Sequence, residues 1–335
     1  MIKARTRRII QGADYSAQEP RLLSMLCADE GMLQAYRDGK DLYVEIASIA
    51  FHVPYNECLE HFPKDTPITK RKDKWYYSTD EEIASGDYKL ADGETDTYKE
   101  GKERRGQAKK ILLGIMYGRG ETSIAEQLGC EVEEAREIKE SVYIAFPMIK
   151  IFERESARMV KRKGYVTTLW GRKRRLPNYN LPNYEFVYVD PVDKRTVLKD
   201  MPVNSDDIAL YTSKLSNLFW KQKEKYVSDL LAKDSVKVID NGGRIAEAER
   251  QIINSRVQGS ASDMSKLALI KIHNDEELNK RGVRTIIPVH DEILLETPLR
   301  YARYTKKRFS EDMETAAKPK LNIPVSCDVV STQMW

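Results

Sequence analysis

The chain has 335 residues, of which 41% are hydrophobic and 32% are charged, and its formal net charge is +4. This composition excludes a disordered chain and predicts one large or two ordinary globular domains. No segment reaches the roughly 18 apolar residues that span a bilayer, and the first ten residues lack the apolar core of a signal peptide. We therefore expect a soluble, cytoplasmic protein without a membrane partner.

The cationic side chains gather in clusters, although the net charge is small. These clusters occupy residues 3–8, 70–74, 102–110, 158–163 and 172–175. Clustering of this kind favours a polyanionic partner. For any single cluster, a solvated helix face is an equally good explanation. The four cysteines are scattered and show no spacing typical of a zinc or disulfide site.

The first predicted element is a strand over residues 8–13, followed by Asp14 and then a helix. A carboxylate at the end of a strand is held rigidly and can face a cleft, which makes Asp14 a candidate functional residue. Ser16 and Glu19 have the spacing of a helix capping box, so capping is an alternative role for Glu19.

Apolar residues recur at helical spacing over residues 22–36, and Asp41 is expected to cap a second helix that ends near Pro54. Residues 55–98 are less regular. They read as an elaborated connection with a small hairpin around residues 75–77.

A helix predicted over residues 105–118 places Arg105, Lys109, Leu113 and Tyr117 four residues apart on one face. Two cations and a phenol make a poor core face. They suit a site that grips phosphates and stacks a base. A solvated basic helix is the alternative.

Near the C-terminus, two short apolar strands over residues 286–289 and 293–295 enclose His290, Asp291 and Glu292. Adjacent carboxylates on a rigid hairpin are candidate ligands for a hard cation such as Mg²⁺. An ordinary hairpin with a solvated polar turn is the alternative.

Four motifs occur in an order that is typical of one family. They are DYSAQEPR (14–21), RGQAKKILLGIMYG (105–118), ERQIINSRVQGSASD (249–263) and VHDE (289–292). The chain resembles the polymerase domain of family A DNA polymerases, which include bacterial DNA polymerase I and many phage replicative enzymes. The last residues, 323–335, also resemble the usual ending of this family.

The resemblance implies a two-metal catalytic site. Asp14 and Asp291, with the backbone carbonyl of Tyr15, would hold two Mg²⁺ ions, and Glu292 would support them. Lys109 would protonate the leaving group. The catalytic residues implied are therefore Asp14, Asp291, Lys109 and Glu292.

The resemblance also implies two sets of binding residues. Arg105 and Lys109 would bind the phosphates of a deoxynucleoside triphosphate, Tyr117 would close the pocket, and Glu19 would pair with Tyr117 and block a ribose 2′-hydroxyl. The nucleotide-binding set is Tyr15, Glu19, Arg105, Lys109, Leu113 and Tyr117. The set expected to touch primer-template DNA is Arg250, Asn254, Gln258 and His290.

The sequence departs from the family beside these motifs. Leu113 stands where Phe or Tyr is usual, and Tyr43 where a nucleotide-contacting His is usual. Ala17 and Pro20 replace a common Gln and an apolar residue. These changes affect the nucleotide pocket and leave the implied metal ligands untouched.

The expected fold is α/β, a right-hand polymerase with an antiparallel palm sheet and mostly helical fingers. We expect the palm at residues 1–33 and 247–335 and the fingers at 34–246, with insertions at about 55–98 and 178–246. Only about a dozen residues precede Asp14, so the expectation is a fragment or a split enzyme. A second polypeptide or an upstream region would then supply the thumb and an exonuclease.

The sequence therefore predicts a template-directed DNA polymerase in a bacterial or phage-infected cell. One alternative is a non-catalytic nucleic-acid-binding or assembly subunit with a polymerase-like fold. A single-subunit RNA polymerase is another, but Glu19, and HDE in place of HDD, favour DNA as the product.

Overall fold

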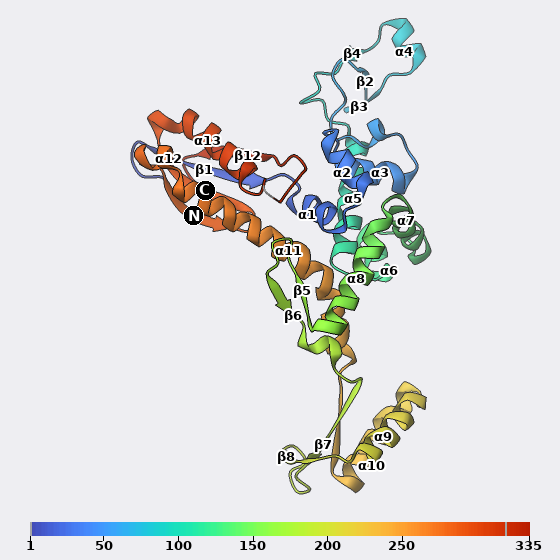
Figure 1. Ribbon diagram of the computed structural model, residues 1–335. Coiled ribbons are helices and arrows are strands. Elements are labelled where there is room, and N and C mark those ends of the chain that lie inside the picture. Colours follow the sequence, from blue (N-terminus) through green and yellow to red (C-terminus); the bar gives the residue numbers. More distant parts are fainter. Residues whose placement is uncertain (1, 319) are drawn as a thin grey trace.

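The structure is a computed structural model that describes residues 2–318 and 320–335. Its principal sheet is antiparallel, in the order β10–β11–β1–β12, and lies on one side of the molecule (Figure 1). The strands are β10 (Arg284–Val289), β11 (Glu292–Pro298), β1 (Arg8–Tyr15) and β12 (Cys327–Thr332). Both predicted hairpin strands and the predicted first strand are confirmed, and the α/β fold class is confirmed with them.

Helices cover this sheet and connect it with the rest of the chain. Helix α13 (Ala302–Thr315) packs against β1, β11 and β12, and α11 (Gly242–Asn274) packs against α13. With 33 residues, α11 is long enough to run from the sheet far beyond it (Figure 1). Two short elements complete this region, α12 (Glu276–Lys280) and the 3₁₀ turn η3 (Leu299–Tyr301).

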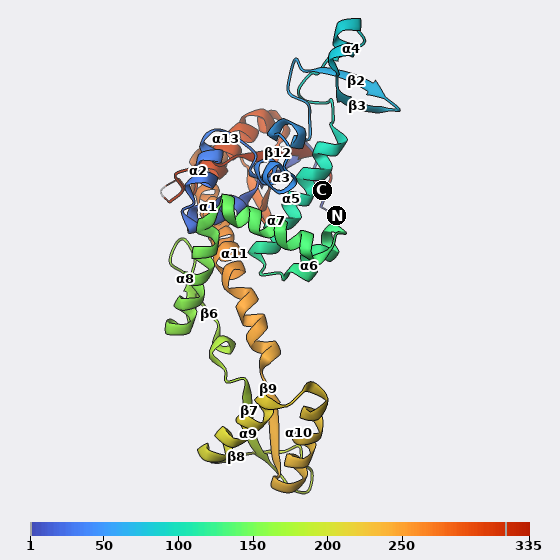
Figure 2. The same ribbon diagram turned by 90° about the vertical axis from the view of Figure 1, so that its right-hand side faces the viewer.

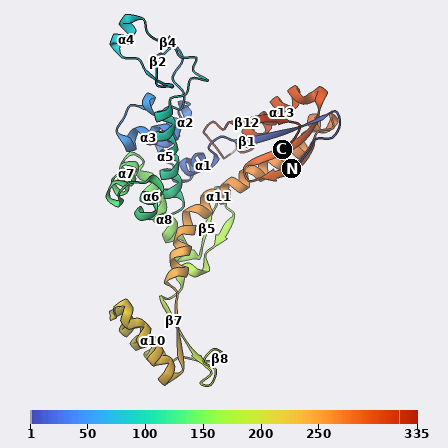
Figure 3. The same ribbon diagram turned by 180° about the vertical axis from the view of Figure 1, so that it is seen from behind.

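The remaining helices form a second group. It contains α1 (Gln18–Cys27), α2 (Glu30–Arg37), α3 (Leu42–Phe51), α5 (Lys99–Met116), α6 (Glu121–Leu128), α7 (Val132–Ala145) and α8 (Pro147–Lys163), with the 3₁₀ turn η1 (Tyr55–Cys58). Seen from behind, the sheet and the other helices of this group lie on opposite sides of α1 (Figure 3).

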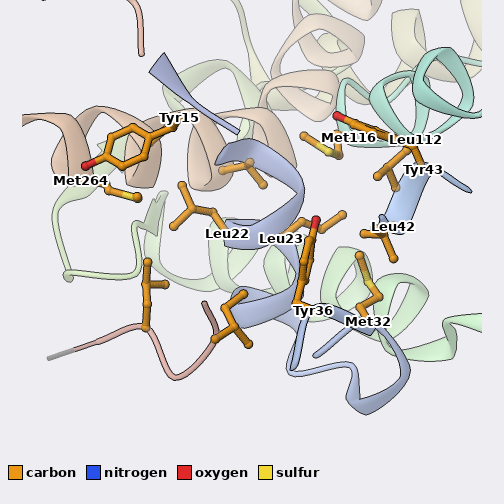
Figure 4. Close-up of a cluster of buried hydrophobic side chains, with 14 of the residues drawn as sticks. Tyr15, Leu22, Leu23, Met32, Tyr36, Leu42, Tyr43, Leu112, Met116 and Met264 are labelled. Carbon is orange, nitrogen blue, oxygen red and sulfur yellow. The ribbon is translucent and has the colours of Figure 1, made fainter. Parts of the chain in front are cut away.

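Apolar packing around α1 joins the two groups. Leu22 and Leu23 are fully buried. Figure 4 shows them between Tyr15 and Met264 at one end and Tyr36 at the other. One continuous core therefore links the end of β1, α11 and the helical group, and it fixes α1 where the chain leaves the sheet.

Two local predictions in this region are wrong. Residues 22–36 do not form one helix, because Ala28 adopts a left-handed conformation and Asp29 caps a new helix by accepting a hydrogen bond from the Met32 amide at 3.1 Å. The capping box at Ser16 and Glu19 is absent, since α1 begins at Gln18 without a side-chain cap. The cap by Asp41 on α3 is confirmed, with the Tyr43 amide 2.8 Å from its carboxylate.

Residues 55–98 form a small subregion around their own apolar cluster. The strands are β2 (Pro67–Arg71), β3 (Lys74–Tyr77) and β4 (Lys89–Leu90), with helix α4 (Asp80–Ser85) after the hairpin. Phe62, Ile68 and Tyr98 are buried beneath them. The predicted hairpin near residues 75–77 is confirmed, and the elaborated connection has a core of its own.

A second subregion, which we call the arm, lies at the far end of α11 from the principal sheet (Figures 1 and 2). It contains β7 (Tyr184–Val189), β8 (Val197–Pro202), α9 (Ser205–Asn217), α10 (Trp220–Asp234) and β9 (Val236–Asp240). A hairpin, β5 (Tyr165–Thr167) and β6 (Lys173–Arg175), and the turn η2 (Pro177–Asn180) precede it.

The division into palm and fingers stays a prediction. Within the described residues, no helix is both long and apolar enough to cross a membrane. All four cysteines are free thiols in this structure.

Candidate active site

The predicted carboxylates meet where two neighbouring strands end. Ala13 on β1 lies opposite Ile293 on β11, so Asp14 comes next to the β10–β11 turn that carries Asp291. His290 adopts a left-handed conformation, with φ of 56°, and thereby makes the tight turn. Asp14 and Asp291 line the same cavity of about 650 Å³.

The electrostatics of Asp14 reflect this convergence. Partial burial and the negative charge of Asp291 raise the pKa of the Asp14 carboxyl to about 6, and Glu292 acts in the same direction. A carboxylate whose ionisation is opposed by a neighbouring negative charge forms a site that gains free energy when a cation binds beside it.

The Glu292 carboxylate occupies the space that a side chain on Gly12 would fill. A Cβ atom on Gly12 would lie only 2.1 Å from Oε1 of Glu292 and 3.0 Å from Cδ2 of Leu294. The glycine in β1 therefore leaves the space that the Glu292 carboxylate occupies on the adjacent strand. Glu292 itself lies outside the cavity lining, beside the two aspartates.

Tyr15 turns its side chain away from the cavity. Its hydroxyl donates a hydrogen bond to the Met313 carbonyl at 2.9 Å, and the ring is buried in the core. Because the residue still contributes to the cavity wall, its backbone is the part that can interact with a bound group.

The opposite wall of the cavity is cationic. Arg105, Lys109, Leu113 and Tyr117 line it from α5 and its C-terminal cap, as the i+4 spacing predicts. The Arg105 guanidinium and the Lys109 ammonium lie 5.5 and 6.0 Å from the centre of the Tyr43 ring. The Tyr43 ring can therefore form cation–π interactions with both side chains.

Arg105 has a carboxylate partner, Asp41, at the start of α3. Two of its nitrogens lie 2.8 and 2.7 Å from Oδ2 of Asp41, whose other oxygen caps α3. One aspartate thus orders both the helix start and the guanidinium. A phosphate that binds Arg105 has to share it with Asp41 or displace Asp41.

Glu19 and Tyr117 close the cavity on the side that faces α11. The Tyr117 hydroxyl donates to Oε2 of Glu19 at 3.1 Å, and the Gln258 amide lies 3.5 Å from the same hydroxyl. Burial raises the pKa of Glu19, and the hydrogen bond from Tyr117 opposes that shift. The contact places Glu19 in the cavity instead of at a helix cap.

A second cavity, of about 800 Å³, continues from the first along α11. It shares Glu19, Tyr117 and Asp291 with the first and adds Gln258 and His290. Two of the four residues predicted to touch primer-template DNA therefore lie in one groove that opens beside the carboxylates.

Arg250 and Asn254 lie further along α11 and line neither cavity. The end of α5 rests on this part of α11, since a Cβ on Gly118 would lie 3.1 Å from the Arg250 Cα. Oδ1 of Asn254 is buried, and no donor among the described residues reaches it.

Several lining residues were missed in the sequence. Tyr36 and Asp41 reach the first cavity from α2 and its connection to α3, and Ser262 and Lys266 reach the second from α11. Lys266 follows Gln258 by eight residues on α11, so the helical period was a signal that could have identified it. No local signal indicated Tyr36, which Arg21 covers at 4.4 Å.

The carboxylate site fits a hard divalent cation through the chemistry of its donors. Mg²⁺ binds oxygen and usually takes only one or two protein carboxylates, with water and substrate phosphates completing its shell. Asp14, Asp291 and the Tyr15 backbone match that pattern. Throughout the described residues, no group of three or more His, Cys, Asp or Glu side chains gathers as an all-protein metal cage.

Paired carboxylates on an antiparallel sheet, opposite a cationic helix, form a site suited to metal-assisted chemistry on a phosphate compound. The sequence profile of DNA polymerase family A matches residues 92–189 and 207–335, well over half of the chain. The chain belongs to DNA polymerase family A, which confirms the resemblance seen in its motifs.

Full-length relatives cover almost the whole chain. DNA polymerase I of Borreliella burgdorferi is 25% identical over 333 residues, which is 99% of this chain and 25% of the relative. Thermostable DNA polymerase I of Thermus aquaticus is 24% identical over 98% of the chain and 27% of its own length. DNA polymerase theta of Drosophila melanogaster is 23% identical over 98% of the chain and 11% of its own length. The chain spans about a quarter of the bacterial relatives.

A solved structure has the same fold. The POL domain of Pol1 from M. smegmatis, in complex with DNA primer-template and dNTP, aligns with 99% of this chain and 41% of its own at a TM-score of 0.64. At 21% sequence identity, this likeness concerns the fold.

Proposed function

We propose that this chain carries the catalytic site of a template-directed DNA polymerase. One observation carries the proposal: a single cavity joins the carboxylates Asp14 and Asp291 on one wall to Arg105 and Lys109 on the other. Nucleotidyl transfer needs both parts, since the hydroxyl must be activated beside a triphosphate whose charge is neutralised. Family membership supports the same reaction.

In the proposed reaction, the primer 3′-hydroxyl releases its proton to water, and its oxygen forms a bond to the α-phosphorus of a deoxynucleoside triphosphate. The bond from that phosphorus to the bridging oxygen breaks, and pyrophosphate leaves with the electron pair. Two Mg²⁺ ions, when bound, would lower the pKa of the hydroxyl and neutralise the leaving group. Asp14, Asp291 and the Tyr15 backbone would hold them.

The side chains on α5 would handle the triphosphate. Arg105 and Lys109 would bind its phosphates, and Lys109 would donate a proton to the departing pyrophosphate oxygen. Tyr117 offers a ring for the new base pair. Gln258 and His290 would contact the primer-template in the adjoining groove, with Arg250 and Asn254 further along α11.

We further propose that Glu19 selects the sugar. Tyr117 holds its carboxylate in the cavity, where it would exclude a ribose 2′-hydroxyl. Glu19→Ala is expected to raise ribonucleotide incorporation relative to deoxynucleotide incorporation by at least tenfold. An enzyme whose natural product is RNA would gain nothing, so an unchanged ratio would favour that alternative.

The test is primer extension with Mg²⁺ and four deoxynucleotides, by the chain alone and with a thumb-containing polypeptide as the predicted partner. Asp14→Ala and Asp291→Ala should each abolish extension. Asp328→Ala is a matched control, because Asp328 lies opposite Asp14 on the neighbouring strand but lines no part of the first cavity. DNA binding without extension under either condition would instead favour a non-catalytic subunit.

A further inference from the structure

The connection between α9 and α10 in the arm exposes two large aromatic side chains. Phe219 is 79% exposed and Trp220 is 71% exposed, at the connection between α9 and α10. Single apolar residues on a surface are ordinary, but adjacent exposed rings on one turn form a patch that calls for an occupant. Figure 2 shows the arm well separated from α1 and α5, which line the cavity described above.

The turn is well ordered, so the rings are not exposed by fraying. The Phe219 amide donates to Oε1 of Gln222 at 3.2 Å, and the Gln222 amide returns a bond to the Phe219 carbonyl at 2.9 Å. Leu215, one turn earlier, is 1% exposed and anchors α9 in the core of the arm with Leu230. The backbone therefore holds both rings outward on a fixed base.

Lysines flank the two rings along the chain. Lys214, Lys221 and Lys225 are exposed, and none forms an ion pair with a carboxylate in the part of the chain that the structure describes. Lys221 and Lys225 share a face of α10, and the Lys221 ammonium lies 5.3 Å from the centre of the Trp220 ring. Glu224 is the one acidic residue between 214 and 225.

We propose that the α9–α10 turn, formed by residues 214–225, binds single-stranded nucleic acid outside the catalytic cavity. Exposed rings offer faces on which unpaired bases stack, and unpaired lysines attract the phosphates between those bases. A protein partner fits this composition less well, because lysine is depleted in protein interfaces while it is the most frequent residue here.

The first test measures the binding of a labelled 20-nucleotide oligothymidine by the full chain. Phe219→Ala/Trp220→Ala should weaken binding about tenfold and leave the affinity for a blunt duplex unchanged. The matched control is Val192→Ala/Met201→Ala, which removes two other exposed apolar side chains of the arm. Equal loss in both double variants, or no loss in either, would overturn the proposal.

The second test uses the salt dependence of the same binding. Lys221→Ala/Lys225→Ala should reduce the slope of log K against log salt by about 1.4, since each phosphate contact on a single strand contributes about 0.7. Lys199→Ala/Lys233→Ala, which removes two exposed lysines elsewhere on the arm, should leave the slope unchanged. An unaltered slope in the first variant would contradict the proposal.

Two further readouts separate this proposal from its competitors. If Phe219→Ala/Trp220→Ala loses self-association in sedimentation while oligonucleotide binding is unchanged, residues 214–225 form a protein-binding surface and the proposal fails. Asp291→Ala should keep full arm-dependent binding, because Asp291 lies outside the arm. The failure of the proposed catalysis is therefore distinguishable from the failure of the arm site.

Discussion

Gly12 is the residue whose lack of a side chain the site depends on most. Gly12→Ala should push the Glu292 carboxylate from its place, because the new methyl group would overlap Oε1. We expect at least a tenfold fall in kcat for primer extension and a loss of about 1–3 kcal/mol in the free energy of unfolding.

Gly243→Ala is the matched control for Gly12→Ala, since a Cβ there meets no atom within 4 Å. Circular dichroism and urea unfolding would establish that both variants fold. Normal kcat in folded Gly12→Ala would contradict a role for the position of Glu292.

Asp41 links the cap of α3 to the cation that faces the cavity. Asp41→Asn should keep the cap, because Asn and Asp cap helices equally well, while it removes the charge that competes for Arg105. We expect the Kd of the incoming nucleotide to fall by about three- to tenfold, which corresponds to about 1 kcal/mol.

Equilibrium titration of the enzyme–DNA complex with deoxynucleotide would measure the effect of Asp41→Asn. Glu30→Gln is the control, because Glu30 pairs with Arg37 on α2 and neither residue lines the cavity. A higher Kd in Asp41→Asn would show that Asp41 instead orders Arg105 for binding.

The sequence predicted the residues on the cationic face of α5, but it did not predict which residues contact them. Arg105, Lys109, Leu113 and Tyr117 share one helix, so a fixed period places them together. The meeting of Asp14 with Asp291 depends on strand pairing across 277 positions, which no local pattern encodes. For the same reason, the family resemblance was needed to connect the two aspartates.

At the scale of elements, breaks in helices were the hardest feature to predict. The apolar period continues through residues 22–36, yet the Asp29 carboxylate offers the chain a new helix start and wins over continuation. The hydrophobic period was correct, and a short polar residue decided where the new helix begins.

The chain before β1 is tied to β11 by one buried carboxylate. Glu296 is 7% exposed and accepts hydrogen bonds from the Arg5 amide at 3.0 Å and from Nε of Arg5 at 2.9 Å. Nε of Arg8 forms an ion pair with the same carboxylate at 3.2 Å. The Arg5 hydrogen bonds and charge hold the pKa of Glu296 at about 2. Ionised Glu296 therefore stabilises the fold above its ordinary pKa near 4.5, and this stabilisation is lost as the pH falls from about 4.5 to 2.

Glu296→Gln should lower the free energy of unfolding by about 1–2 kcal/mol at pH 7, and the difference from wild type should shrink at pH 3. Urea unfolding at both pH values measures this change. Glu276→Gln, which alters an exposed carboxylate on α12, should have no measurable effect at either pH. A Glu296→Gln deficit that stays constant with pH would refute the ionic role.

At the scale of the whole molecule, the apolar clusters show which parts of the chain share a core with the candidate active site. One core joins the principal sheet to the helices that carry Arg105 and Tyr43. The arm and residues 55–98 have small cores of their own. Composition predicted a sizeable core, but the sequence alone did not show that these two segments form separate clusters.

The central claim is that one cavity combines a carboxylate wall for chemistry with a cationic wall for nucleotide binding. Single-turnover incorporation of one deoxynucleotide, measured over a range of nucleotide concentrations, separates these roles. Asp291→Ala should reduce the maximal rate by at least a thousandfold with the nucleotide Kd within about threefold of wild type, whereas Arg105→Ala should raise that Kd at least tenfold. If both substitutions instead changed Kd alone, or left rate and Kd as in wild type, the carboxylates would not be catalytic and the account would be wrong.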